Sequence, residues 1–241
     1  MTKQWLIIRP KGLPVSFHLN RRVPVILLVL TLVTLLAMVL SVGYGEYPIS
    51  PIDVVKTLLG IPTANGDYAF IINTLRLPRT ITAFLVGVGL AIAGTITQGI
   101  TRNPLAAPSI IGVNAGATLA AVTLLILLPN TPVSLLPFAA FGGALTVSLL
   151  IYLLAWQGGS SPVRLILVGI GFSLIAGALT DIMITFGEIN TVSQALVWLA
   201  GSVYGRSWSQ VFSLIPWIII FGAIAFLMDR NNLEPLSSLP A

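Results

Sequence analysis

The sequence predicts an all-α membrane protein, a polytopic bundle of about six transmembrane helices. Hydrophobic residues make up 56% of the 241 residues and charged residues only 8%, whereas an average soluble domain contains roughly 25% charged residues. The stretch between Arg102 and Arg164 contains no Asp, Glu, Lys or Arg. A surface with so little charge is poorly suited to water, so we expect most of the chain to lie in the lipid bilayer.

The long apolar runs have the length of transmembrane helices. A helix needs about 20 apolar residues to cross the bilayer core, and the runs lack the alternation of polar and apolar residues that is typical of barrel strands. Clusters of Pro, Gly, Asn and Ser separate them. Within a predicted transmembrane domain of residues 23–228, the expected spans are 23–42, 80–100, 110–128, 135–156, 165–186 and 212–228.

The distribution of basic residues predicts the orientation of the chain. Cytoplasmic loops carry an excess of Lys and Arg, and the N-terminal tail, residues 1–22, has five basic residues and no acidic one. We therefore expect this tail to be cytoplasmic. Six spans then return the tail of residues 229–241 to the cytoplasm and place the loop of residues 43–79 outside. Eight basic residues are cytoplasmic on this arrangement and four are external.

Two arginines, Arg76 and Arg79, lie in this outer loop, at the mouth of the second span. Their position is unusual, because external loops are poor in arginine and a positive charge at a helix N-terminus opposes the helix dipole by roughly 0.3–1 kcal/mol. Pro78 is predicted to be the first helical residue and Leu77, which precedes it, to be extended. The residues leave two roles open: anchoring to lipid phosphates, which suits arginine, and docking of an acidic partner from outside.

The same outer loop is predicted to contain a short amphipathic helix. It starts at Ser50 or Pro51 and is expected to lie on the outer membrane surface. Its apolar face consists of Ile52, Val55, Leu58 and Leu59.

Small and polar residues inside the spans indicate a compact bundle with a few functional candidates. Small residues recur at four-residue spacing, as at Gly87 and Ala91, which predicts close helix packing. Polar groups at membrane depth are costly unless paired, so Gln98, Asn114 and Asp181 are candidates for a transport pathway. We expect Gln98 and Asn114 to hydrogen-bond across the turn between spans two and three. Asp181, toward the outer end of span five, either lines the pathway or extends to the interface.

No enzyme motif is present in the sequence. It lacks a P-loop, an HExxH pair and a GxSxG elbow, and it has no cysteine and a single histidine, His18, in the basic tail. The residues therefore predict a transport protein and not an enzyme, with no cofactor, no metal site and no nucleic-acid partner.

Two adjoining stretches of the sequence resemble a known family. Residues 75–94 run from LRLPRT into the glycine-rich LVGVGLAIAG, and residues 98–117 contain QGITRNPLAAP and GVNAGA. Both are similar to the permease subunits of ABC importers for iron-siderophores, haem and cobalamin, the FecCD-type family. Residues 167–171 resemble the start of that family's fifth helix, and residues 198–208 resemble the lead into its sixth. The similarity extends from about residue 25 to about residue 228.

The resemblance implies a permease subunit of the bacterial plasma (inner) membrane. Such a subunit forms the translocation pathway of a ferric-siderophore or related metal-chelate importer as a homo- or heterodimer. Two cytoplasmic ATPase subunits hydrolyse ATP, and an extracytoplasmic binding protein delivers the chelate. The arginines of this motif receive acidic residues of that binding protein, which gives Arg76 and Arg79 a docking role. Helix five lines the pathway in the family.

The sequence also departs from the family pattern. Type II importer permeases typically have about ten helices, with a coupling loop after the sixth, whereas residues 229–241 resemble only the entry to that loop. The expected fold is therefore the N-terminal part of such a permease. Two alternatives stay open: a non-transporting fragment or membrane scaffold from a truncated permease gene, and a secondary transporter. The latter is disfavoured because no inverted pair of broken helices with ionisable sites is evident.

Overall fold

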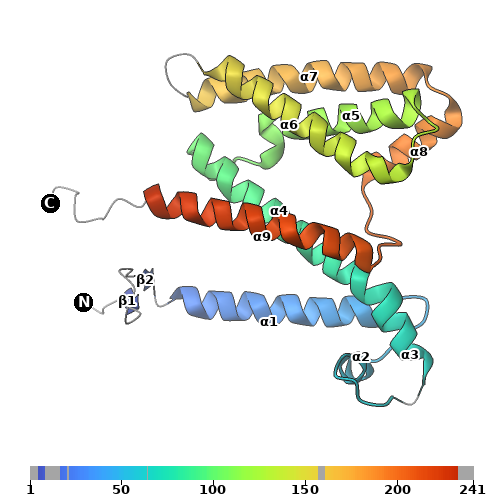
Figure 1. Cartoon of the computed structure of the whole chain (residues 1–241). Coiled ribbons are helices and arrows are strands. Elements are labelled where there is room, and N and C mark those ends of the chain that lie inside the picture. The colour runs from blue at the N-terminus through green and yellow to red at the C-terminus, as the bar shows by residue number, and fades with distance from the viewer. Residues whose placement is uncertain (1–4, 9–16, 21, 64, 157–160, 233–241) are drawn as a thin grey trace. The chain divides into compact units, whose positions relative to one another are not determined.

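The computed structural model describes residues 5–8, 17–20, 22–63, 65–156 and 161–232, and it is predominantly helical (Figure 1). Five helical segments within these residues are long and apolar enough to cross a membrane. The chain divides into two compact units, residues 1–83 with 205–212, and residues 84–204 with 213–241. The five candidate spans are Arg22–Gly43, Asp67–Thr101, Val133–Ala155, Pro162–Phe186 and Trp208–Leu227.

The first unit contains the N-terminal helix and the segment that leads to the second candidate span. A short antiparallel strand pair, which the sequence analysis did not anticipate, precedes the helix. In chain order the elements are β1 (Trp5–Ile8), β2 (Phe17–Asn20), α1 (Arg22–Gly43), α2 (Pro51–Leu58), α3 (Asp67–Phe70), the π-helix η1 (Ile71–Arg76) and the start of α4 (Leu77–Thr101).

A small apolar core holds the first unit together at the C-terminal end of α1. Val42 of α1, Ile49 of the following loop, Val54 of α2 and Ile72 of η1 are all buried there. Tyr68 is among the partly buried side chains that pack against them. Because these residues come from α1, the loop that follows it, α2 and η1, the core fixes the short helices against the end of α1.

The helix that begins at Asp67 continues without interruption to Thr101. The predictions for Leu77 and Pro78 were therefore wrong: Leu77 is helical, with φ −63° and ψ −47°, and Pro78 lies inside the helix. The π-helix explains how proline is accommodated. In a π-helix each N–H donates to the carbonyl five residues earlier, and the Leu77 N–H donates to the Ile72 carbonyl in this way. The corresponding acceptor for residue 78 is the Asn73 carbonyl, but Pro78 has no N–H to donate.

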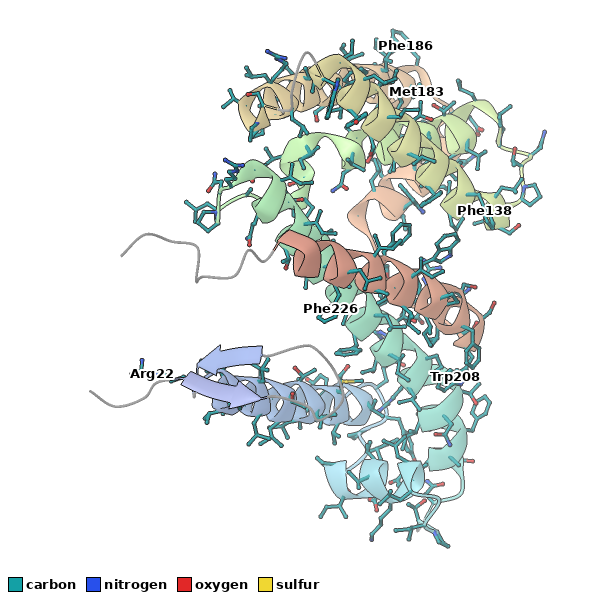
Figure 2. The ribbon with its side chains drawn as sticks, turned by 60° about the vertical axis from the view of Figure 1, so that its left-hand side comes forward. Arg22, Phe138, Met183, Phe186, Trp208 and Phe226 are labelled. Carbon is teal, nitrogen blue, oxygen red and sulfur yellow. The ribbon has the colours of Figure 1, made fainter. Side chains whose placement is uncertain are left out.

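The Asn73 carbonyl receives its hydrogen bond from a distant residue. The indole Nε1–H of Trp208, in the first turn of α9 (Trp208–Asn232), donates to it at 2.9 Å. Trp208 lies in the same unit as Asn73, and Figure 2 labels it at the start of α9. A tryptophan side chain thus supplies the donor that proline lacks.

The second unit is organised around α5. This helix packs against α6, α7 and α8, and the packing is close because glycines meet. A Cβ added to Gly116 would lie 2.5 Å from the Gly143 carbonyl oxygen, and one added to Gly112 would lie 2.5 Å from the Gly169 carbonyl oxygen. The helices are α5 (Val113–Leu127), α6 (Leu136–Ala155), α7 (Pro162–Phe186) and α8 (Ile189–Ala200), with 3₁₀ turns at Pro108–Ile111 and Val133–Leu135.

The predicted span of residues 110–128 is not a single helix. Gly112 has a φ of +85°, a left-handed conformation that glycine adopts without steric cost, and it separates the 3₁₀ turn from α5. The 15 residues of α5 extend about 22 Å at 1.5 Å per residue. This helix alone is shorter than a bilayer core of about 30 Å.

The glycines of α4 differ from those of α5. A Cβ added to Gly87, Gly89, Gly94 or Gly99 would meet nothing within 4 Å. The close packing that the sequence predicts for the second span is therefore not found at these glycines in the described part of the chain, whereas it is found in α5 and α7.

Candidate docking site and intramembrane polar residues

Arg76, the last residue of η1, is half-buried and bound to the backbone. Its Nη1 donates to the carbonyls of Val42 at 2.9 Å and Gly43 at 3.1 Å, and its Nη2 donates to the carbonyl of Tyr47 at 2.5 Å. A Cβ added to Gly45 would lie 2.8 Å from Nη2, so the guanidinium group also lies against the backbone of residue 45.

These contacts make Arg76 a cap for α1. Val42 and Gly43 are the last two residues of that helix, whose final carbonyls lack partners within the helix and carry the negative end of its dipole. A guanidinium group satisfies them with charge-assisted hydrogen bonds. The reach to Tyr47 fixes the turn that leaves the helix, and Tyr47 in turn packs edge-on against Tyr68 with ring centroids 6.1 Å apart.

Arg79 has a different environment from Arg76, although both belong to one continuous helix. It lies in the first turn of α4, where its side chain is exposed, between the buried Pro78 and Thr80. The structure thus distinguishes the two arginines of the motif: one holds internal carbonyls and the other lies at the surface.

Gln98 closes the turn that follows α4. Its Nε2 donates to the Pro104 carbonyl at 2.9 Å, and its own carbonyl accepts the Asn103 N–H at 3.2 Å. The Asn103 side chain accepts the Leu105 N–H at 2.9 Å. The expected hydrogen bond between Gln98 and Asn114 is not found among the described residues, where the Gln98 side chain bonds to the Pro104 carbonyl instead.

Asn114 and Asp181 are both exposed and lie on different helices. Asn114 is in the first turn of α5, and Asp181 is in the last two turns of α7, where its backbone carbonyl accepts the Thr185 hydroxyl at 2.7 Å. Among the residues that the structure describes, no hydrogen bond joins Asp181 to Gln98 or Asn114. The three candidates therefore form no single polar cluster.

An apolar groove between α5 and α6 was missed by the sequence analysis. It is open to the surface and has a volume of about 410 Å³. Its only polar side chains are threonines, one of which, Thr123, bonds to the Leu119 carbonyl at 2.7 Å. The glycines at which the two helices cross are the sequence signal that could have indicated it. Its lining residues are Gly116, Leu119, Ala120, Thr123, Ala139, Gly143, Thr146 and Val147.

Within the described ranges no group of three His, Cys, Asp or Glu side chains is arranged to hold a metal ion. The candidates predicted from the sequence are, in the described residues, an arginine bound to backbone carbonyls, an exposed arginine and three polar side chains on three different helices. Together with the long apolar helices, they define a polytopic integral membrane protein.

The chain belongs to the FecCD transport family, whose model matches residues 32–236. It is 39% identical over 213 residues to the Fe(3+)-citrate import system permease protein YfmE of Bacillus subtilis, covering 87% of this chain and 62% of the relative. It is 42% identical over 201 residues to the achromobactin transport system permease protein CbrC of Dickeya dadantii, covering 83% of this chain and 57% of the relative. It thus spans about three fifths of the length of these relatives.

A solved structure has a similar fold. It is described as an inward-facing conformation of a metal-chelate type ABC transporter, and it matches with a TM-score of 0.74 at 27% sequence identity. The match covers 88% of this chain and 65% of that one. The fold of this chain is therefore that of an ABC transporter permease, as the resemblance implied.

Proposed function

We propose that the chain is a transmembrane permease subunit of an ATP-driven importer for a ferric-siderophore or a related metal chelate. The observation that carries this proposal is the family match over residues 32–236. It is supported by relatives that are named for Fe(3+)-citrate import and achromobactin transport. The proposed location is the bacterial inner membrane, with the N-terminus in the cytoplasm, in keeping with the five basic residues of the tail.

The permease works with several partners in this proposal. A second permease subunit, identical or different, completes the translocation pathway, two cytoplasmic ATPase subunits drive it, and an extracytoplasmic binding protein delivers the chelate. The absence of a P-loop motif from the sequence supports ATP hydrolysis on a separate subunit. Gln98, Asn114 and Asp181 remain candidates for the pathway, and the exposure of Asp181 on α7 is consistent with such a position.

Arg76 and Arg79 form the docking surface for the binding protein in this proposal. The exposed Arg79 forms an ion pair with a carboxylate of the partner, and Arg76 stabilises the turn to which it is bound at Tyr47. Reversing Arg79 to glutamate is expected to weaken binding-protein association and to reduce its dependence on salt, because exposed ion pairs are screened by salt. Unchanged affinity and an unchanged salt slope would instead favour anchoring to lipid phosphates.

Uptake of radioactive iron tests the whole proposal. The chain is co-expressed with the ATPase and the binding lipoprotein of a ferric-chelate importer, in a strain that lacks its own ferric-chelate permeases. Cells are supplied with iron citrate or an iron hydroxamate. Uptake above background is expected, and it is expected to disappear when the P-loop lysine of the ATPase is replaced. Background uptake with all three proteins present at normal levels would contradict the proposal.

A further inference from the structure

Helix α2 has an apolar arc of which only one edge is buried. Val54 is 0% exposed in the core at the end of α1. On the same helix Ile52 is 67% exposed and Leu59, which follows its last turn, is 69% exposed. The large apolar side chains of α2 are therefore only partly used by the core of the first unit.

The exposed apolar residues form one continuous surface. Successive helical residues are about 100° apart, so the order around α2 from Val54 is Leu58, Val55, Leu59 and Ile52, and then Lys56. Around the helix, a buried apolar side chain is thus followed by exposed apolar side chains and then by an exposed lysine. This order is typical of a helix whose apolar side lies in a membrane interface while its lysine reaches the headgroups.

The acidic residue of α2 is held away from this surface. Asp53 lies on the other side of the helix, and its Oδ2 accepts the Ser50 hydroxyl at 2.8 Å. Ser50 in turn caps the helix by accepting the Asp53 N–H at 3.2 Å. A C-terminal Schellman motif, with Ile61 N–H to Lys56 O at 2.9 Å and Gly60 N–H to Thr57 O at 3.1 Å, closes the other end. The backbone groups at both ends of α2 are therefore hydrogen-bonded within the helix and its flanking residues.

The depth of α2 relative to α1 fits the boundary of the bilayer. The 22 residues of α1 extend about 33 Å, close to the hydrocarbon thickness of about 30 Å. Val54 packs on Val42, in the last turn of α1, so α2 lies at the level where α1 leaves the hydrocarbon. Figure 1 shows α2 nearly end-on beside the lengthwise α1, so the axis of α2 crosses that of α1. A helix with this direction at this depth lies along the interface.

We infer that α2 is an interfacial anchor, which inserts Ile52, Val55 and Leu59 between phospholipids at the end of α1 and places Lys56 among their phosphates. Leu36 and Leu40, in the last two turns of α1, are also exposed, so we expect lipid to surround α1 up to the level of α2. This inference does not depend on the transport function.

Spin labelling of the full chain tests the inference, and the natural absence of cysteine makes it direct. Single variants Ile52→Cys and Leu59→Cys carry a nitroxide in vesicles of phosphatidylethanolamine and phosphatidylglycerol. Collisions with oxygen, which concentrates in lipid, are compared with collisions with a water-soluble nickel chelate. Leu32→Cys in α1 provides the reference within the bilayer, and the exposed Asp67→Cys provides the reference in water.

The labels at residues 52 and 59 are expected to give an oxygen-to-nickel ratio between those at residues 32 and 67, and well above the latter. A label at Lys56→Cys is expected to lie closer to the value at residue 67. A ratio at residues 52 and 59 equal to that at residue 67 would place the arc in water and overturn the inference. Immobilised labels that neither reagent reaches would overturn it as well, because protein would then cover the arc.

Discussion

At the scale of single residues, Arg76 lies inside a helix that begins at Asp67 and not at a helix N-terminus, where the sequence analysis placed it. Its charge lies against the C-terminal carbonyls of α1, at Val42 and Gly43, where a helix dipole favours a cation. The cost expected at a helix start therefore does not apply to Arg76, and its charge stabilises the end of another helix. Arg79, by contrast, is exposed.

The first prediction separates these two arginines. Arg76→Lys keeps the charge but loses the forked donor that reaches three carbonyls, so the turn of residues 44–49 is expected to loosen by about 1–3 kcal/mol. Hydrogen exchange followed by mass spectrometry measures this at the Ile49 amide, which donates to the Gly43 carbonyl at 3.0 Å. Arg79→Lys is the matched control and is expected to leave exchange unchanged. Equal exchange in the two variants would remove the capping role from Arg76.

The second prediction concerns the donor that replaces the missing proline N–H. Trp208→Phe removes the hydrogen bond to the Asn73 carbonyl and keeps a ring that can stack on Phe212, whose centroid is 5.8 Å away. The loss is expected to lower the free energy of unfolding by about 0.5–1.5 kcal/mol, measured from reversible denaturation in detergent.

A double-mutant cycle with Pro78→Ala provides the control for the second prediction. Alanine supplies an N–H that can bond to Asn73, so Trp208→Phe is expected to cost less in the Pro78→Ala background. Pro78 is fully buried, and the cycle cancels the cavity that its replacement leaves. An identical cost of Trp208→Phe in both backgrounds would show that the indole and the proline are not linked.

At the scale of elements, sequence pattern was sufficient where an element depends on its own residues. The apolar run of residues 23–42 predicted α1, which spans Arg22–Gly43, and Ser50 and Pro51 predicted the start of α2. The sequence pattern failed where the structure of a segment depends on residues that are distant in the chain. The helical course through Pro78 depends on Trp208, and the role of Arg76 depends on carbonyls more than 30 residues away. The conformational propensities of neighbouring residues cannot predict such long-range contacts.

The third prediction tests the glycine contact between α5 and α6. Gly143→Ala is expected to destabilise the chain by about 1–3 kcal/mol, since its Cβ would collide with the Gly116 carbonyl and the Ala120 side chain. Gly142→Ala, at the adjacent position in the same helix, places its Cβ where nothing lies within 4 Å. That control is expected to be neutral or slightly stabilising, because alanine favours helix. Thermal unfolding in detergent measures both, and equal midpoints would contradict the close contact.

At the scale of the whole molecule, the proposed docking and transport both depend on which side of the membrane each loop occupies. Arg76 donates to the carbonyls of Val42, Gly43 and Tyr47, and Arg79 follows it within one helical turn, so the end of α1, the turn at residues 44–47 and Arg79 share a side. The turn after α4, which Gln98 closes, lies at the opposite end of a helix long enough to cross the membrane. A binding protein can reach Arg79 only if the first of these sides is external, as the basic N-terminal tail predicts.

The fourth prediction tests this orientation with two of the most exposed large apolar side chains among the described residues. Tyr44, in the turn after α1, is 89% exposed, and Leu105, in the turn after α4, is 87% exposed. In the cysteine-free chain, Tyr44→Cys is expected to react with a membrane-impermeant maleimide in intact spheroplasts. Leu105→Cys is expected to react only after the membrane is permeabilised, and a permeant maleimide should label both. The reverse pattern would put Arg79 in the cytoplasm, where no extracytoplasmic partner could meet it, and would remove the docking role while leaving the fold intact.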